Sequence, residues 1–236
     1  FRPVPMLGGA KAIHEPWRNT LAHLMYALDW ERIAEADVDL EVIRFLKGKP
    51  LEIMQAMAQK GLNSPLASSA GRLFDAVAAA VGICRESAGF EGQAAIELEA
   101  LAAGQFKQQA DFAYGFELKD GYLGWTPLWS GLLKDLRQGV APGIIAARFH
   151  QGVAAAVAET ASRLCRQFAI QTLVLSGGVF QNRLLLERVT ELAQNQGLDV
   201  LSPTVTPLND GGLSLGQALV AMASWRQCRA NTPSSA

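Results

Sequence analysis

Apolar residues recur at helical spacing along most of the chain. Trp17, Leu21 and Leu24 lie three to four positions apart, which is the pattern of an amphipathic helix. A longer pattern of the same kind begins at Pro142, which suits a first helical turn, and continues to Arg166. Further helices are predicted over residues 40–47, 50–59, 66–81 and 91–101, with a short one from Thr126. We therefore expect a helical part over about residues 10–104 and a long helix after it.

The last third of the chain has a different pattern. An apolar run of strand length, Thr172–Leu175, is followed by two glycines and a helical pattern. A second short run covers Leu198–Leu201, and a final helix is expected up to about Trp225. Such a strand–helix–strand unit, within about residues 140–228, implies two parallel strands joined by a crossover. With a further strand predicted over Asp111–Leu118, the fold class is a helix-rich α/β protein.

Composition narrows the choice of partners. Half of the 236 residues are apolar, so the chain can bury a sizeable core. The net charge is −1 and the basic residues are scattered, which argues against a nucleic-acid surface. Charges interrupt every apolar stretch well before the ~20 residues that a membrane span needs, so no membrane partner is expected.

The cysteines and the two ends suggest where the protein resides. Cys84, Cys165 and Cys228 are far apart and odd in number, so we expect neither a disulfide framework nor a zinc knuckle, and a cytoplasmic protein. The first residue is Phe1, so the natural N-terminus is expected upstream. Residues 231–236 are small and polar, as in a frayed tail.

Two glycine pairs are candidates for an anion site. Gly177-Gly178 and Gly211-Gly212 each precede a predicted helix, where free N–H groups and the helix dipole favour phosphate. Two such turns in one unit suggest a nucleotide. Neither pair completes a known phosphate-loop pattern, so purely structural turns remain an equal alternative.

Three polar side chains each allow a structural or a ligand-binding interpretation. Asp75 lies on a side of helix 66–81 that is otherwise made of small residues such as Gly71. A ligand could approach this side closely, or another helix could pack against it while Asp75 remains in solvent. Asn182 either caps the helix after Gly178 or binds a ligand. Asp210 either caps the last helix or provides an oxygen ligand to a metal.

The three histidines offer no catalytic or metal-binding pair. His14, His23 and His150 have no spacing that would place two of them on one helix face, so each is interpreted as a surface or packed residue. No Ser-His-Asp or Cys-His arrangement is indicated either.

Several strings occur together and in order between about residues 6 and 226. They are Leu7-Gly8-Gly9, Glu15-Pro16-Trp17-Arg18, Ser69-Ala70-Gly71-Arg72-Leu73-Phe74-Asp75-Ala76, Ser176-Gly177-Gly178-Val179-Phe180-Gln181-Asn182-Arg183 and, after Asp210, Gly211-Gly212-Leu213-Ser214-Leu215-Gly216-Gln217. Together they resemble the C-terminal region of the HypF carbamoyltransferases, which function in hydrogenase maturation. Residues 1–236 would then be the C-terminal portion of a HypF/TsaD-like carbamoyltransferase domain.

The resemblance implies a fold and a site. The region is similar to the TsaD-type tRNA threonylcarbamoyl transferases, and so implies one lobe of an actin-like ATPase, a ribonuclease H-like fold with helical insertions. By this resemblance ATP or carbamoyl adenylate would bind with Mg²⁺, and Asp210 would be a metal ligand. The residues implied in nucleotide binding are Gly71, Asp75, Gly92, Gly177, Gly178 and Asn182.

The resemblance also implies what lies elsewhere. The family's paired metal-binding histidines and first phosphate loop precede the matched region, so the other ligands of a divalent transition metal, zinc or iron, would lie upstream. The acylphosphatase, zinc-finger and YrdC-like modules are absent from these 236 residues. This chain alone is therefore expected to be inactive, either as a fragment or as one part of a split enzyme.

The implied activity is carbamoyl transfer. The parent enzyme would use carbamoyl phosphate and ATP, and would pass carbamoyl from carbamoyl adenylate to the C-terminal cysteine of a HypE-like acceptor, on the way to the cyanide ligands of NiFe hydrogenase. Two alternatives remain at this point: a tRNA threonylcarbamoyl or small-molecule O-carbamoyltransferase, and a noncatalytic docking module.

Overall fold

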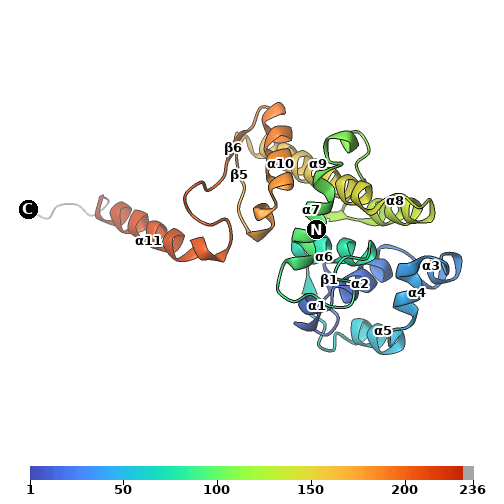
Figure 1. The fold of residues 1–236 in the computed structure, drawn as a ribbon. Coiled ribbons are helices and arrows are strands. Elements are labelled where there is room, and N and C mark those ends of the chain that lie inside the picture. The colour runs from blue at the N-terminus through green and yellow to red at the C-terminus, as the bar shows by residue number, and fades with distance from the viewer. Residues whose placement is uncertain (231–236) are drawn as a thin grey trace, which may run out of the picture.

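The structure is a computed structural model, and it describes residues 1–230. The tail over 231–236, for which the sequence indicates fraying, lies outside the described residues. The chain forms a helical body from which the last helix extends outward (Figure 1). The α-helices are α1 (Lys11–His14), α2 (Trp17–Ala27), α3 (Trp30–Ala36), α4 (Glu41–Lys47), α5 (Leu51–Lys60), α6 (Ala70–Ala80), α7 (Gln93–Ala103), α8 (Thr126–Arg137), α9 (Pro142–Phe168), α10 (Arg183–Asn195) and α11 (Leu213–Ala230).

The strands are short and form three separate pairs. β1 (Val4–Pro5) pairs antiparallel with β2 (Leu66–Ala67), and β3 (Glu117–Lys119) pairs antiparallel with β4 (Tyr122–Gly124). β5 (Thr172–Val174) and β6 (Asp199–Leu201) are parallel, with Thr172 opposite Asp199. The predicted strand–helix–strand unit is therefore confirmed, with α10 as its connecting helix.

The long helix α9 is central to the packing. α7 and α10 pack along it, while α6 lies between α2 and α7. The apolar faces of these helices meet in one main core, whose largest fully buried side chains include Trp129, Phe74 and Phe149. Because each helix presents one apolar stripe, the stripes can be removed from water together only in such a bundle.

Two predicted segments differ in the structure. The helix expected over 66–81 begins at Ala70, because Leu66–Ala67 pairs with β1 and the Ser69 hydroxyl caps the helix by accepting from the Arg72 N–H. The strand expected over 111–118 is limited to its end, β3, while Asp111–Phe116 runs irregularly over α9, where the Tyr114 N–H donates to the Arg148 carbonyl at 3.2 Å. α3 was not predicted, although Asp29 caps it in the expected way.

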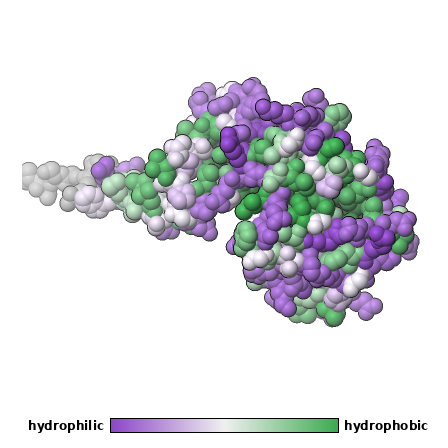
Figure 2. Space-filling view, viewed as in Figure 1, coloured by the Kyte–Doolittle hydropathy of each residue, from purple (hydrophilic) through white to green (hydrophobic). Residues whose placement is uncertain are grey.

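The last helix has an unusual surface. α11 carries no charged residue between Leu213 and Trp225, and its large apolar side chains Leu213, Leu215, Leu219, Val220 and Met222 are exposed. Figure 2 shows hydrophobic surface along this extended helix. Within residues 1–230 no helix combines the length and the apolar character that crossing a membrane requires.

The structure describes the side chains of two of the three cysteines. Cys84 and Cys165 are free thiols, and Cys165 is buried. The side chain of Cys228 lies outside the described part of the chain.

Candidate functional site

Helix α6 holds Asp75 in a buried position. The cap at Ser69 fixes the start of the helix, and Leu73, Phe74 and Val77 anchor it in the core. Asp75 is 3% exposed, so the alternative of a solvated carboxylate is wrong. Its Oδ2 lies 2.8 Å from Arg72 Nη1, yet neither atom has a partner in hydrogen-bond geometry. Asp75 thus keeps acceptor capacity that nothing within the described residues fills.

Burial dominates the electrostatics of this carboxyl. It raises the pKa of Asp75 to about 6, against the opposing charge of Arg72 and with a smaller contribution from Glu91. Arg72 also lies 3.8 Å from Glu91, whose neighbour Gly92 begins α7 with a φ of 85°. Asp75 and Gly92 are therefore linked through Arg72, and a Cβ at Gly92 would meet nothing within 4 Å.

The two glycine turns lie next to each other. Gly177, with a φ of 104°, leads into the short 3-10 helix η2 (Gly178–Gln181), and its N–H donates to the carbonyl of Leu208 at 2.9 Å. A second 3-10 helix, η3 (Asp210–Gly212), begins two residues after Leu208. Both turns follow the carboxyl ends of parallel strands, an edge where open sheets bind ligands.

The amides at the start of α10 are already occupied. Arg183 and Leu184 donate to Glu99 Oε1 at 2.7 and 3.2 Å, and Leu185 donates to Asn182 Oδ1 at 2.9 Å. The expectation that this helix offers free N–H groups is therefore wrong, because side chains cap them. The exposed Gly177-Gly178 turn at the start of η2 therefore remains available to contact a ligand.

Asn182 is held by two partners. Its Oδ1 caps α10, as the capping alternative predicted, and its Nδ2 donates to His150 Nε2 at 2.9 Å. Asn182 is 8% exposed. His150 lies in the middle of α9 and its ring packs edge-on against Phe74, the neighbour of Asp75, with centroids 5.2 Å apart. This contact connects the glycine turn to α6.

Sequence reasoning left His150 as a surface or packed residue outside the site, and the structure shows it packed. No local signal reveals the contact, because His150 and Asn182 are far apart along the chain and meet only when α10 packs on α9.

Asp210 is exposed and lies on the second turn. Asn209 caps the 3-10 helix η3 that leads into α11, because its Oδ1 accepts from the Gly211 N–H at 3.1 Å. No group of three or more His, Cys, Asp or Glu residues within the described chain could hold a metal ion. Asp210 therefore offers one carboxylate and is not part of such a group within residues 1–230.

The arrangement suits binding better than nucleophilic attack. Burial lowers the pKa of His150 to about 4 and that of His23 to about 3, so both rings stay neutral at pH 7. Burial and then Glu97 raise the pKa of the Cys84 thiol, which keeps it protonated. What the described residues offer is a buried carboxylate with open acceptor capacity and an exposed glycine turn.

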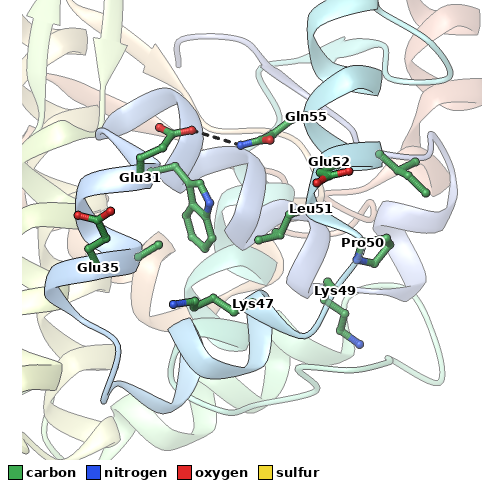
Figure 3. A pocket seen from close by; sticks show the side chains of 11 residues that line it. Glu31, Glu35, Lys47, Lys49, Pro50, Leu51, Glu52 and Gln55 are labelled. Atoms are coloured by element: carbon green, nitrogen blue, oxygen red, sulfur yellow. Dashed lines mark hydrogen bonds between the residues drawn. The ribbon is translucent and has the colours of Figure 1, made fainter.

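A separate groove lies away from these residues. A groove of about 620 Å³ runs between α3 and the α4–α5 connection, and its lining includes Trp30, Glu31, Glu35 and Lys47 (Figure 3). Gln55 donates to Glu31 across it at 3.4 Å. None of its lining residues belongs to the predicted site.

Comparison with known proteins gives one family. The model of the carbamoyltransferase Kae1-like domain, second subdomain, matches residues 1–217. The carbamoyltransferase HypF of Rhodobacter capsulatus is 38% identical over 223 residues, which cover 94% of this chain and 28% of that protein. The tRNA N6-adenosine threonylcarbamoyltransferase of Thermus thermophilus is 27% identical over 185 residues, covering 78% of this chain and 52% of the relative.

Solved structures agree. Full-length HypF in its phosphate- and nucleotide-bound form superposes with a TM-score of 0.80 at 33% identity, covering 94% of this chain and 28% of that one. HypF of T. kodakarensis gives a TM-score of 0.78 at 27% identity, covering 94% of this chain and 29% of that one. These matches confirm the helix-rich lobe of an actin-like ATPase fold. The chain spans less than a third of these HypF proteins.

Proposed function

This chain belongs to the HypF carbamoyltransferase family, and we propose that it forms the nucleotide-binding part of such an enzyme. In this proposal the parent enzyme uses ATP and carbamoyl phosphate, and carbamoyl passes from carbamoyl adenylate to the C-terminal cysteine of a HypE-like protein. The product serves the synthesis of the cyanide ligands of NiFe hydrogenase.

One observation carries the proposal from this chain's own residues. Asp75 is buried beside Arg72 with an Oδ2 that lacks a hydrogen-bond partner. A buried carboxylate that has an ion pair but no aligned hydrogen bond is incompletely satisfied, and a ribose hydroxyl that donates to it would supply the missing bond. A solved relative is described as nucleotide-bound, which is the same class of ligand.

The other site residues have distinct roles in the proposal. Gly71 and Gly92 leave room beside Asp75, because neither carries a side chain. Gly177 and Gly178 bring the backbone close to the phosphate, and Asn182 fixes the end of their turn. Asp210 would hold Mg²⁺ or a transition metal, zinc or iron, with ligands from outside this chain, and that ion would offset phosphate charge.

The first test is binding of ATP with Mg²⁺ to the 236-residue chain, measured by titration calorimetry. We expect Asp75→Asn to weaken binding at least about tenfold, since the amide replaces an acceptor with a donor. Asp199→Asn is the matched control, because Asp199 is exposed at the opposite end of the parallel strands. Its affinity should equal that of the unaltered chain.

Two results would contradict the proposal. Equal binding by the Asp75 variant would remove this residue from the site. If the unaltered chain binds no nucleotide, the titration is repeated with this chain joined to the remaining segments of a HypF protein. Absence of binding there too would leave a docking module as the better function.

A further inference from the structure

His150 occupies a special place between the two sides of the site. It is fully buried, and its ring packs edge-on against Phe74 and Phe149 with centroids 5.2 and 5.7 Å away. Phe74 precedes Asp75, and Asn182 follows the glycine turn. The ring is therefore in contact with both segments that the nucleotide would touch.

The hydrogen bonds of His150 fix which nitrogen carries the proton. Nδ1 lies 2.7 Å from the carbonyl oxygen of Ala146, which can only accept, so Nδ1 is the protonated nitrogen. Nε2 is then an acceptor, and it receives a hydrogen bond from Asn182 Nδ2 at 2.9 Å. This assignment requires a neutral ring, in agreement with the lowered pKa.

The same bond fixes the orientation of the Asn182 amide. With Nδ2 directed at His150, Oδ1 is directed at the N–H of Leu185 and caps α10. If Asn182 flipped, Nδ2 would face the Leu185 N–H, donor against donor. His150 thereby selects the amide orientation in which Asn182 caps the start of α10.

We propose that His150 is a positioning residue that sets the Asn182 amide, and through it the Gly177–Asn182 turn, for nucleotide binding. This inference rests on the proposed nucleotide site. His150 itself is buried and touches no ligand in this arrangement, so its effect reaches the nucleotide only through Asn182.

The test compares three substitutions. His150→Phe keeps an aromatic ring among Phe74 and Phe149 but removes the acceptor. His150→Gln retains an acceptor oxygen near the place of Nε2. His23→Phe is the matched control, because His23 is also a buried histidine among aromatic rings, against Trp125 and Trp129, yet neither of its nitrogens has a hydrogen-bond partner within the described residues.

Two readouts separate positioning from general stability. Amide exchange by NMR on this chain follows the Leu185 N–H, with Arg183 and Leu184, which donate to Glu99, as internal references. Nucleotide affinity is measured on a HypF protein that carries this chain. We expect His150→Phe to accelerate exchange at Leu185 alone and to weaken nucleotide binding about tenfold. His150→Gln should restore both, and His23→Phe should change neither.

The remaining outcomes overturn the inference in distinguishable ways. Unchanged Leu185 exchange in His150→Phe would show that His150 does not hold Asn182. Faster exchange with unchanged affinity would limit His150 to capping α10. If the unaltered HypF protein binds no nucleotide, the proposed function itself fails, whatever Leu185 does.

Discussion

At the scale of single residues, the buried titratable groups respond to pH in opposite directions. Burial lowers the pKa of His23 to about 3, so the unfolded chain takes up a proton below pH 6.5 that the folded chain does not. This group therefore lowers the free energy of unfolding as pH falls. Asp75, whose pKa is raised to about 6, does the reverse, since its folded form takes up the proton first.

We expect His23→Phe to reduce the loss of stability between pH 7 and pH 5 by about 1–2 kcal/mol, because a proton no longer binds the unfolded state selectively. Urea unfolding at the two pH values measures this. Asp75 contributes equally to both proteins and cancels. A His23 variant as acid-sensitive as the parent would show that this ring is not buried as a neutral group.

Residue-level predictions from sequence succeeded where the signal is local. Asn182 precedes a helical pattern, and capping by such a residue is a local event, so this role could be considered in advance. The burial of Asp75 could not, because on a helix of mostly small residues both faces look apolar, and only the packing of α6 between α2 and α7 decides which side meets water. The contact of His150 with Asn182 depends on tertiary packing for the same reason.

At the scale of elements, the close approach of residues 113–116 to α9 depends on Gly152. A Cβ built on Gly152 would lie 2.2 Å from the carbonyl oxygen of Tyr114, which real Cβ atoms do not approach. The Tyr114 side chain is fixed as well, because its hydroxyl donates to Asp135 Oδ2 at 2.5 Å and Asp135 pairs with Arg148 of α9 at 2.6 Å. The segment therefore cannot shift without breaking these bonds.

Gly152→Ala should lower the free energy of unfolding by about 3 kcal/mol, measured by urea denaturation, because the added methyl group meets backbone. The sign of this change in the free energy of unfolding is informative, because replacing Gly by Ala inside a helix ordinarily stabilises the protein by about 1 kcal/mol. Gly104→Ala is the control: a Cβ there meets nothing within 4 Å and its φ is −68°. If both variants were equally stable, residues 113–116 would have to lie farther from α9.

The same elements show the limits of sequence periodicity. Most of the helices were predicted because one apolar face repeats every three to four residues, and β5 and β6 were predicted because each is an apolar run beside a turn. β1 was not predicted, because a strand of two residues shows no periodicity and its partner, β2, is distant in the chain. Asp111–Phe116 alternates like a strand, yet Tyr114 is buried and its hydroxyl donates to Asp135 of α8 instead of lying on a sheet.

At the scale of the whole molecule, α11 carries a run of exposed apolar side chains. Its uncharged stretch leaves Leu219 and Val220 half or more exposed, at 51% and 67%. A contiguous apolar surface of this kind drives association in water. We expect the 236-residue chain to sediment faster as its concentration rises.

Leu219→Lys should weaken this association, as measured by sedimentation velocity at several concentrations, because a charge would have to be buried. Leu118→Lys is the matched control, since Leu118 is also exposed but lies on β3, away from α11. If the unaltered chain stayed monomeric at all concentrations, the apolar side chains of α11 would have to be covered by another part of the same molecule.

The central position of α9 also sets the order in which the core can close during synthesis. Three of its partners, α6, α7 and residues 113–116, precede it in the chain, so Phe74 meets Phe149 only after residues 142–168 have left the ribosome. At about 5–20 residues per second, the first helices wait several seconds with an apolar face uncovered. A nascent chain arrested before Pro142 is therefore a substrate for chaperones and proteases, and release of the next thirty residues ends that exposure.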